Sequence, residues 1–336
     1  MHCELVVPGL LRANSAERLP ALELLLARGR SCALDAGSLE LWLEENFLED
    51  CPSGQQLLPA GALTLLAHGD DARAQTWVRA DPVHLQAMRD RLVMVPGEAL
   101  SISRKDADAL CAALNTQLEG RVELRAVEPE RWCARLSGQL PWPGEPALQI
   151  AGRSLEAQPG AAQAGDALLT ELQMLLHEHP VNEAREARGE LPVNSLWLWG
   201  AGGLPTGASS RWQSVAAAEP LALGLARLAG TRALGLPASA ALWLSGAPQD
   251  GRHLFILDAL RAPLALSDEE SLQNRLPLLE RNWFSPLLDA LREGLVGMVT
   301  IHVPDRASGV SFETIRGDLR RFWRRARPAS SWAQQE

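Results

Sequence analysis

The chain of 336 residues contains no tyrosine, a single lysine at Lys105 and only five cysteines, all widely spaced. No two cysteines form a CxxC pair, which argues against a zinc knuckle and against a disulfide framework. No apolar run approaches the roughly 18 residues that a membrane-spanning helix needs. The first residues also lack the basic segment of a secretory signal. These absences predict a cytoplasmic protein with reduced thiols and no contact with a membrane.

The charge balance is acidic, with a net charge of −9 at pH 7. Hydrophobic residues make up 46% of the chain and charged residues 22%, which is typical of a folded globular protein. The length indicates one large domain or two smaller ones. An acidic chain has no overall attraction for nucleic acid or anionic membranes. Nucleic acid is therefore not an expected partner of the chain as a whole.

Phosphate-binding loops of the common kinds are absent as well. The glycine-rich run at 200–203, GAGG, is neither GxGxxG nor a Walker A loop, because no Lys followed by Ser or Thr comes at the required spacing. We therefore favour a tight turn at the end of a strand over a phosphate cradle.

The hydrophobic pattern alternates between helix-like and strand-like segments, which predicts an α/β fold. Ser103 opens one helix as a cap, and apolar residues recur behind it at helical spacing. The predicted helices are 18–29, 62–67, 103–117, 166–177, 221–230, 317–327 and one or two within 268–295. The predicted strands are 4–7, 122–126, 194–199, 241–246, 252–258 and 296–303, and four of these (194–199, 241–246, 252–258 and 296–303) are assigned to one core sheet.

The most informative stretch is 175–202, LLHEHPVNEAREARGELPVNSLWLWGAG. We expect a helix that ends before Pro180, a polar loop and then a buried strand. Its pattern HPVN-x-x-R…PVN-x-LWLWGAG resembles the stretch HPVN-x-x-R…G…PAN-x-IWLWG-x-G of archaeal-type cofactor-independent phosphoglycerate mutases, members of the alkaline phosphatase superfamily. The chain looks like a divergent proteobacterial branch labelled RpfE-type regulatory protein.

This resemblance implies an alkaline-phosphatase-like three-layer α/β core with a smaller inserted α+β domain. The core is expected from residues 1–77 and 146–336, and the insertion from residues 78–145. The Pro- and Gly-rich run 139–160 is expected to be the linker that returns from the insertion to the core.

The residues that carry catalysis in the family are mostly replaced. Where the first metal-binding Asp is expected, the chain has Pro8, and the slot of the nucleophilic Ser falls on Gly61, or on Leu58 in another register. The family's metal ligands survive at most as Asp258, His302 and Asp305, and His302 is expected to be a hydrogen-bonded structural residue. We therefore predict no catalytic residues, no metal site and no cofactor.

Six polar residues are candidates for binding a small phosphorylated or anionic ligand. Arg79 matches a substrate-binding Arg of the family, and the others supply donors suited to an anion. They are Arg79, His84, His179, Asn182, Arg185 and Asn194. Caps and local ion pairs are an equally good explanation for Asn182, Arg185 and Asn194.

The basic run 317–327, GDLRRFWRRAR, permits two interpretations. In the first, a surface helix docks onto the protein through Leu319, Phe322 and Trp323. In the second, the helix contacts a phosphate-bearing ligand, RNA or an acidic partner. We favour docking.

Two functions follow from these observations. The first is a phosphoglycerate-mutase-like protein that has lost the metal site and the Ser nucleophile and acts as a regulatory or binding protein with a protein partner. The alternative is a working metal-dependent, 2,3-bisphosphoglycerate-independent mutase or a related phosphatase whose ligands are aligned differently.

Overall fold

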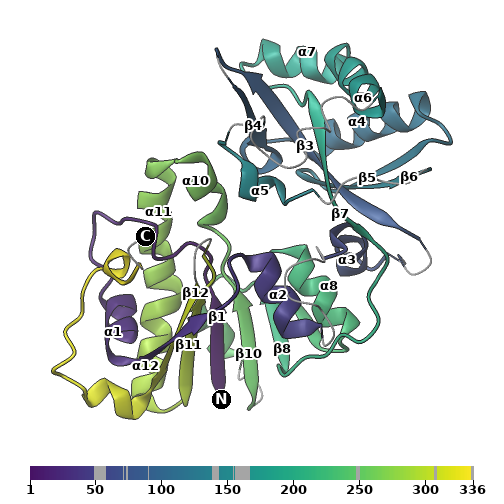
Figure 1. The fold of residues 1–336 in the computed structure, drawn as a ribbon. Coiled ribbons are helices and arrows are strands. Elements are labelled where there is room, and N and C mark those ends of the chain that lie inside the picture. Colours follow the sequence, from purple (N-terminus) through teal and green to yellow (C-terminus); the bar gives the residue numbers. More distant parts are fainter. Residues whose placement is uncertain are drawn as a thin grey trace. The chain divides into compact units, whose positions relative to one another are not determined.

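A computed structural model describes residues 1–48, 58–70, 72, 75–89, 91–137, 144–153, 155, 167–246, 250–305 and 309–333. The chain forms two compact units (Figure 1). The first unit comprises Met1–Ser53 and Gly207–Glu336, and the second comprises Gly54–Thr206. The insertion expected at 78–145 lies within the second unit, which extends beyond it at both ends. Half of the expected linker 139–160 lies outside the described residues.

The first unit is built on a seven-stranded sheet. In spatial order its strands are β2 (Arg30–Leu34), β12 (Gly309–Ile315), β11 (Met298–Val303), β1 (His2–Val6), β10 (Arg252–Ile256), β8 (Ser214–Ala217) and β9 (Arg232–Gly235). The five strands from β11 to β9 run parallel to one another, and β12 is antiparallel to both of its neighbours. Parallel strands need both faces covered, which explains their apolar sequences.

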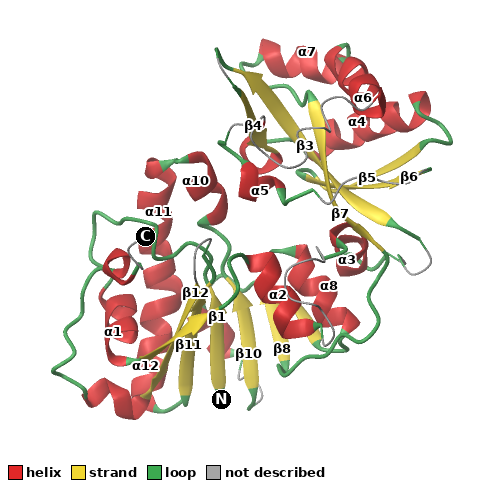
Figure 2. Ribbon diagram, viewed as in Figure 1, coloured by secondary structure: helices red, strands yellow, loops and turns green. Residues whose placement is uncertain are grey.

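Helices cover both faces of this sheet (Figure 2). Alternate residues of β1 point to opposite sides, so Cys3 and Leu5 face one layer while Glu4 faces the other. The first layer contains α1 (Pro20–Arg28), α9 (Ala240–Ser245), α10 (Arg261–Leu266), α11 (Glu269–Leu279) and α12 (Ser285–Glu293). The second contains α2 (Leu39–Phe47) and α8 (Pro220–Leu228). The predicted three-layer α/β core is confirmed.

The second unit is an antiparallel sheet with its own core. Its strand order is β4 (Leu92–Pro96), β3 (Trp77–Ala87), β6 (Arg131–Leu136) and β5 (Val122–Glu128), and β7 (Ser195–Gly202) also pairs with β3. The helices are α3 (Ala60–Ala67), α4 (Arg104–Gln117), α5 (Ala147–Ile150), α6 (Ala167–His177) and α7 (Pro180–Ala187). The helix predicted at 103–117 is confirmed as α4, and Ser103 caps it by accepting from the Asp106 amide at 3.0 Å.

Two features of the informative stretch differ from prediction. The polar loop after Pro180 is helix α7, because Pro180 occupies a first-turn position that needs no N–H and His179 caps the helix. The strand does not end in a turn at Gly200. It continues to Gly202, and Gly200 adopts a positive φ of +59° where a Cβ would lie 2.5 Å from that of Ala60.

Two strand assignments to the core sheet were wrong. Residues 195–199 belong to β7 in the sheet of the second unit, where they pair with β3. Residues 241–245 lie in helix α9, because the Ser239 hydroxyl accepts from the Leu242 amide at 3.1 Å and so caps a helical turn.

The basic helix predicted at 317–327 was also wrong. Only a short 3₁₀ segment, Arg316–Arg320, is helical, and the chain turns away at Arg321. Phe322 and Trp323 are 78% and 67% exposed, so the expected docking through these rings does not occur. None of the described helices has the length and apolar character needed to cross a membrane.

Candidate functional site

Ligand sites of parallel α/β sheets form where the strands end at their carboxyl edge. In the first unit, β1 ends in Val7-Pro8-Gly9, and Asp258 and Asp305 follow β10 and β11 closely. Glu219 lies two residues after β8, where it caps α8 by accepting from the Leu221 amide at 3.2 Å. This edge therefore carries carboxylates, but no side chain at position 8 that could bind a metal.

An arginine occupies the space among these carboxylates. Arg261, the first residue of α10, donates to Glu40 at the start of α2, and its Nη1 lies 3.7 Å from Oε2 of Glu219. The Arg261 side chain is 11% exposed, and those of Glu40 and Glu219 are 7% and 6% exposed. Burial alone would lower the pKa of Arg261, but the charges of Glu40, Glu219 and Asp258 raise it. The guanidinium therefore remains a buried cation.

The resemblance implies divalent metals at such an edge, and the residues present do not fit them. Asp305 lies 3.5 Å from Arg12, and Glu40 and Glu219 already face Arg261. Over the described ranges, no group of three or more His, Cys, Asp or Glu side chains is placed to hold a metal ion. The local positive charge comes from arginine.

Glu4 is a buried carboxylate on the middle strand of the sheet and lies near two partly exposed arginines. Its carboxylate lies 2.9 Å from Nε of Arg252 and 3.5 Å from Nη2 of Arg211, and Nε2 of His302 lies 3.4 Å away. Burial would raise the pKa of Glu4, yet His302 and the nearby cations lower it to about 2. His302 also stacks on Trp42 with ring centroids 5.2 Å apart, which favours the structural interpretation of this histidine.

The slot expected for the nucleophile lies on helix α3 of the second unit. Gly61 packs so closely on β3 that an added Cβ would lie 2.5 Å from the backbone nitrogen of Val78. A serine therefore has no room at Gly61. Leu58, the alternative position, is a buried apolar residue. Thr64 has a hydroxyl, but it is fully buried and accepts from Nη1 of Arg79 at 3.3 Å.

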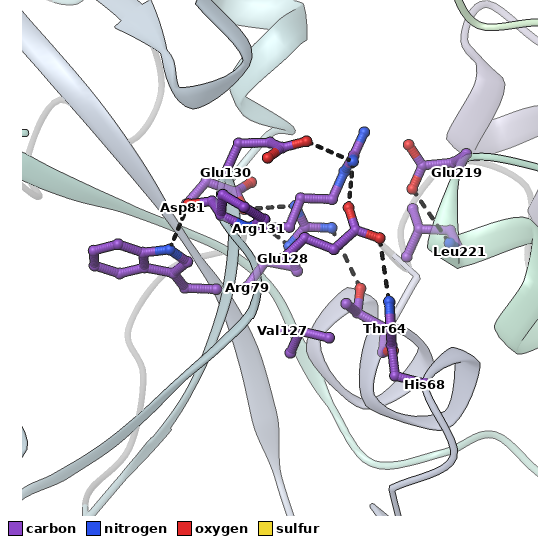
Figure 3. Close-up of polar contacts among 12 residues, drawn as sticks. Thr64, His68, Arg79, Asp81, Val127, Glu128, Glu130, Arg131, Glu219 and Leu221 are labelled. Atoms are coloured by element: carbon purple, nitrogen blue, oxygen red, sulfur yellow. Dashed lines mark hydrogen bonds and ion pairs between the residues drawn. The ribbon is translucent and has the colours of Figure 1, made fainter. Parts of the chain in front are cut away.

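Arg79 is part of a buried network (Figure 3). Its Nε and Nη2 donate to Oδ1 of Asp81 at 2.9 and 2.5 Å, and its guanidinium lies 5.3 Å from the centre of the Trp199 ring. Trp199 donates through Nε1 to Oδ2 of Asp81 at 2.6 Å. The Arg79 and Asp81 side chains are 3% and 7% exposed. The carboxylate of Asp81 thus binds the guanidinium of Arg79, which the sequence had suggested as a binding group for an anionic ligand.

Two carboxyl groups of this network have altered acidity. Burial raises the pKa of Asp81, although the charge of Arg79 opposes the shift. Burial also raises the pKa of the half-buried Glu98 to about 7, and the negative charge of Asp81 adds to the effect. Glu98 therefore changes its protonation near neutral pH.

Three other candidate residues bind the chain's own backbone. Asn182 donates to the carbonyls of Leu176 and Val193 at 2.7 and 2.8 Å and accepts from the Val193 amide at 2.9 Å. Asn194 makes a matched pair of bonds, accepting from the Leu85 amide at 2.7 Å and donating to its carbonyl at 2.9 Å.

Arg185 is fully buried and serves a similar purpose. It donates to the carbonyls of Leu191 (3.0 Å) and Leu100, and its Nη1 lies 3.2 Å from Glu190 without hydrogen-bond geometry. Its contacts join α7 to the loops around it.

The two histidines complete the set. His84 Nδ1 lies 2.9 Å from the Pro192 carbonyl, and His179 Nδ1 accepts from the Val181 amide at 3.1 Å. Burial lowers the pKa of His179, which favours the neutral ring that can accept this bond. Most of the six candidates lie around β3, β7 and α7, and each has a contact within the protein.

Only weak local patterns in the sequence point to the residues that these clusters add. Asp81 stands two positions after Arg79 in a strand, which places both side chains on one face. Arg261 stands three positions after Asp258 in the sequence. Its partners Glu40 and Glu219 are distant in sequence, and no local pattern announces them.

The chain is similar to several solved structures, among them the following two. The PH0037 protein of Pyrococcus horikoshii shares 14% sequence identity over 93% of this chain and 87% of its own, with a TM-score of 0.52. The cofactor-independent phosphoglycerate mutase of Thermoplasma acidophilum shares 17% identity over 100% of this chain and 95% of its own, with a TM-score of 0.41. No family model and no curated protein matches the sequence. The likeness to PH0037 shows a shared fold.

Proposed function

We propose that this chain is a non-catalytic, phosphoglycerate-mutase-like protein that acts in the cytoplasm as a regulatory or binding protein. The observation that carries the proposal is the buried contact of Arg261 with Glu40 and Glu219 at the carboxyl edge of the sheet. The alkaline-phosphatase-like assignment and the regulatory role rest on the sequence motif of residues 175–202.

The chemistry of the family supports the loss of activity. Phosphoryl transfer through a metal-activated Ser needs a nucleophile and positive charge that stabilises the transferred group. Gly61 cannot accept a Cβ without displacing Val78, and Pro8 replaces the first ligand. A fixed guanidinium neutralises nearby carboxylates but cannot supply the open coordination positions that a metal offers a substrate.

Mutase turnover is the direct test. The full-length protein is assayed with 3-phosphoglycerate after incubation with Mn²⁺, Mg²⁺ or Zn²⁺, and phosphatase activity is measured on p-nitrophenyl phosphate. We expect no turnover above buffer with any metal. Metal-dependent turnover that a chelator abolishes would establish the working mutase instead.

Binding of a small anion stays a prediction, and thermal shift with 3-phosphoglycerate tests it. Asn194→Ala and Arg185→Ala would remove two of the candidate residues. A ligand-induced shift in the wild type that both variants lose while remaining folded would support a ligand role. Their backbone contacts lead us to expect lower melting temperatures for both variants, whether or not the anion is present.

A further inference from the structure

The segment 316–327 concentrates positive charge in an otherwise acidic chain. It contains six arginines and one acidic residue, Asp318. Asp318 is buried and accounted for locally, because it accepts from the Ile315 amide at 3.2 Å and pairs with Arg321 at 2.7 Å. We call residues 316–327 the arginine–aromatic segment.

This segment is held against the end of helix α1. Arg28 donates to the Leu319 carbonyl, Arg321 donates to the Arg28 carbonyl at 3.2 Å, and Arg324 donates to the Gly29 carbonyl at 2.6 Å. Arginines at a helix C-terminus satisfy its last carbonyls and favour its dipole. The backbone of the segment is therefore fixed although it is not an α-helix.

Its two aromatic rings point into solvent all the same. Phe322 and Trp323 are the most exposed large apolar side chains of the described residues, and their rings meet edge to face at 5.3 Å and 82°. Arg320, Arg324 and Arg325, which flank them, are exposed too. Fixed apolar rings surrounded by positive charge are costly to leave in water, and such patches mark interaction sites.

We infer that the arginine–aromatic segment is a docking surface for single-stranded nucleic acid. Exposed ring faces stack on unpaired bases, and flanking arginines neutralise phosphates, which together give sequence-tolerant binding. A duplex hides its base faces, and an acidic protein surface would use the charge but offer no stacking partner. Because the chain as a whole carries a net charge of −9, we expect nucleic acid to bind at this positively charged segment and not elsewhere on the surface. This inference rests on the proposed function as a binding protein, and it names single-stranded nucleic acid as the partner.

Fluorescence anisotropy with a fluorescein-labelled 12-residue oligouridylate tests the inference on the full-length protein. We expect binding that weakens as NaCl rises from 50 to 200 mM. Phe322→Ala with Trp323→Ala should weaken binding about tenfold or more, the scale of losing base stacking. Arg320→Glu with Arg325→Glu should weaken it and lower the salt slope by about 1.4, since a single strand contributes about 0.7 for each phosphate contact.

Controls and competitors separate this inference from simpler charge effects. Arg232→Glu and Leu242→Ala alter an exposed arginine and an exposed apolar residue elsewhere in the same unit and should leave affinity unchanged. Polyglutamate of equal charge and phosphatidylserine vesicles should compete poorly. The inference is overturned if the oligonucleotide does not bind, if the aromatic double variant binds normally, or if polyglutamate or vesicles compete equally. None of these outcomes depends on metal binding or turnover.

Discussion

Arg261 and Glu40 form a buried ion pair at the carboxyl edge of the first unit's sheet. Glu219 lies on the other side of the same guanidinium, at 3.7 Å. The guanidinium of Arg261 thus supplies the positive charge at this edge of the sheet. The guanidinium of Arg261 therefore balances the buried negative charge of two carboxylates that come from distant parts of the sequence.

The ion pair should be essential for stability. Arg261→Ala leaves two buried carboxylates without their cation, which should lower the free energy of unfolding by about 3–5 kcal/mol. Arg292→Ala breaks an exposed pair with Asp289 and should cost less than about 1 kcal/mol. Urea unfolding measures both values. Equal small losses in the free energy of unfolding would show that Arg261 does not stabilise this edge. The loss for Arg261→Lys should lie between those of the two alanine variants, because lysine keeps the charge but lacks the planar guanidinium.

Glu4 should make the protein sensitive to acid. Its pKa falls from 4.5 to about 2 on folding, so its stabilisation is present above pH 4.5 and is lost as the pH falls through 2. Glu4→Gln should therefore cost about 3 kcal/mol at pH 7 and progressively less towards pH 2. Urea unfolding at pH 7, 4 and 3 follows this convergence. The exposed Glu17→Gln is the control, and a constant gap between wild type and Glu4→Gln would contradict the account.

Glu98 should act in the opposite direction. Its pKa rises from 4.5 to about 7 on folding, so it costs nothing below pH 4.5 and destabilises progressively as the pH rises through 7. Glu98→Gln should then be more stable than wild type by about 2 kcal/mol at pH 8, allowing for partial exposure, and equal to it near pH 4. Thermal unfolding across this range measures the difference. A wild type that is more stable than the variant at pH 8 would rule out this role.

Restoring the expected hydroxyl should not restore activity. Gly61→Ser forces a Cβ to 2.5 Å from the Val78 nitrogen, which should destabilise the protein by about 2–3 kcal/mol. Gly235→Ala is the matched control, because its Cβ would meet open space. Chemical unfolding and a p-nitrophenyl phosphate assay give the two readouts. A stable Gly61→Ser variant with metal-dependent activity would mean that the nucleophile slot is intact.

Local signals in the sequence predicted α4 and β5 well. Ser103 and the helical spacing behind it define α4, and the alternation in 122–126 matches the buried Val122 and Leu124 of β5. The strand prediction for residues 241–246 was wrong because a short apolar run fits a strand or a helix equally well. The choice depends on the Ser239 cap and on Trp243, which packs edge-on to Phe255 at 4.9 Å.

The clusters that matter for function depend on contacts between distant residues. The two partners of Arg261, Glu40 and Glu219, come from two separate stretches of the chain. Asp81 meets Trp199 only because β3 pairs with β7. The exposure of Phe322 and Trp323 could not be predicted from the sequence either. An apolar stripe docks only if an apolar surface of the folded protein lies against it, and the local sequence does not show whether one does. Local sequence patterns therefore identified most helices and strands but not the contacts that their side chains make with distant residues.

Metal content tests the central claim most directly. The purified full-length protein is incubated with Mn²⁺ and Zn²⁺, desalted thoroughly and subjected to elemental analysis. Our account predicts near-zero retained metal, because Arg261 already provides the cation for the carboxylates at the edge of the sheet. Two equivalents of tightly held metal per chain would contradict it and would favour the alternative, a working metal-dependent mutase or phosphatase.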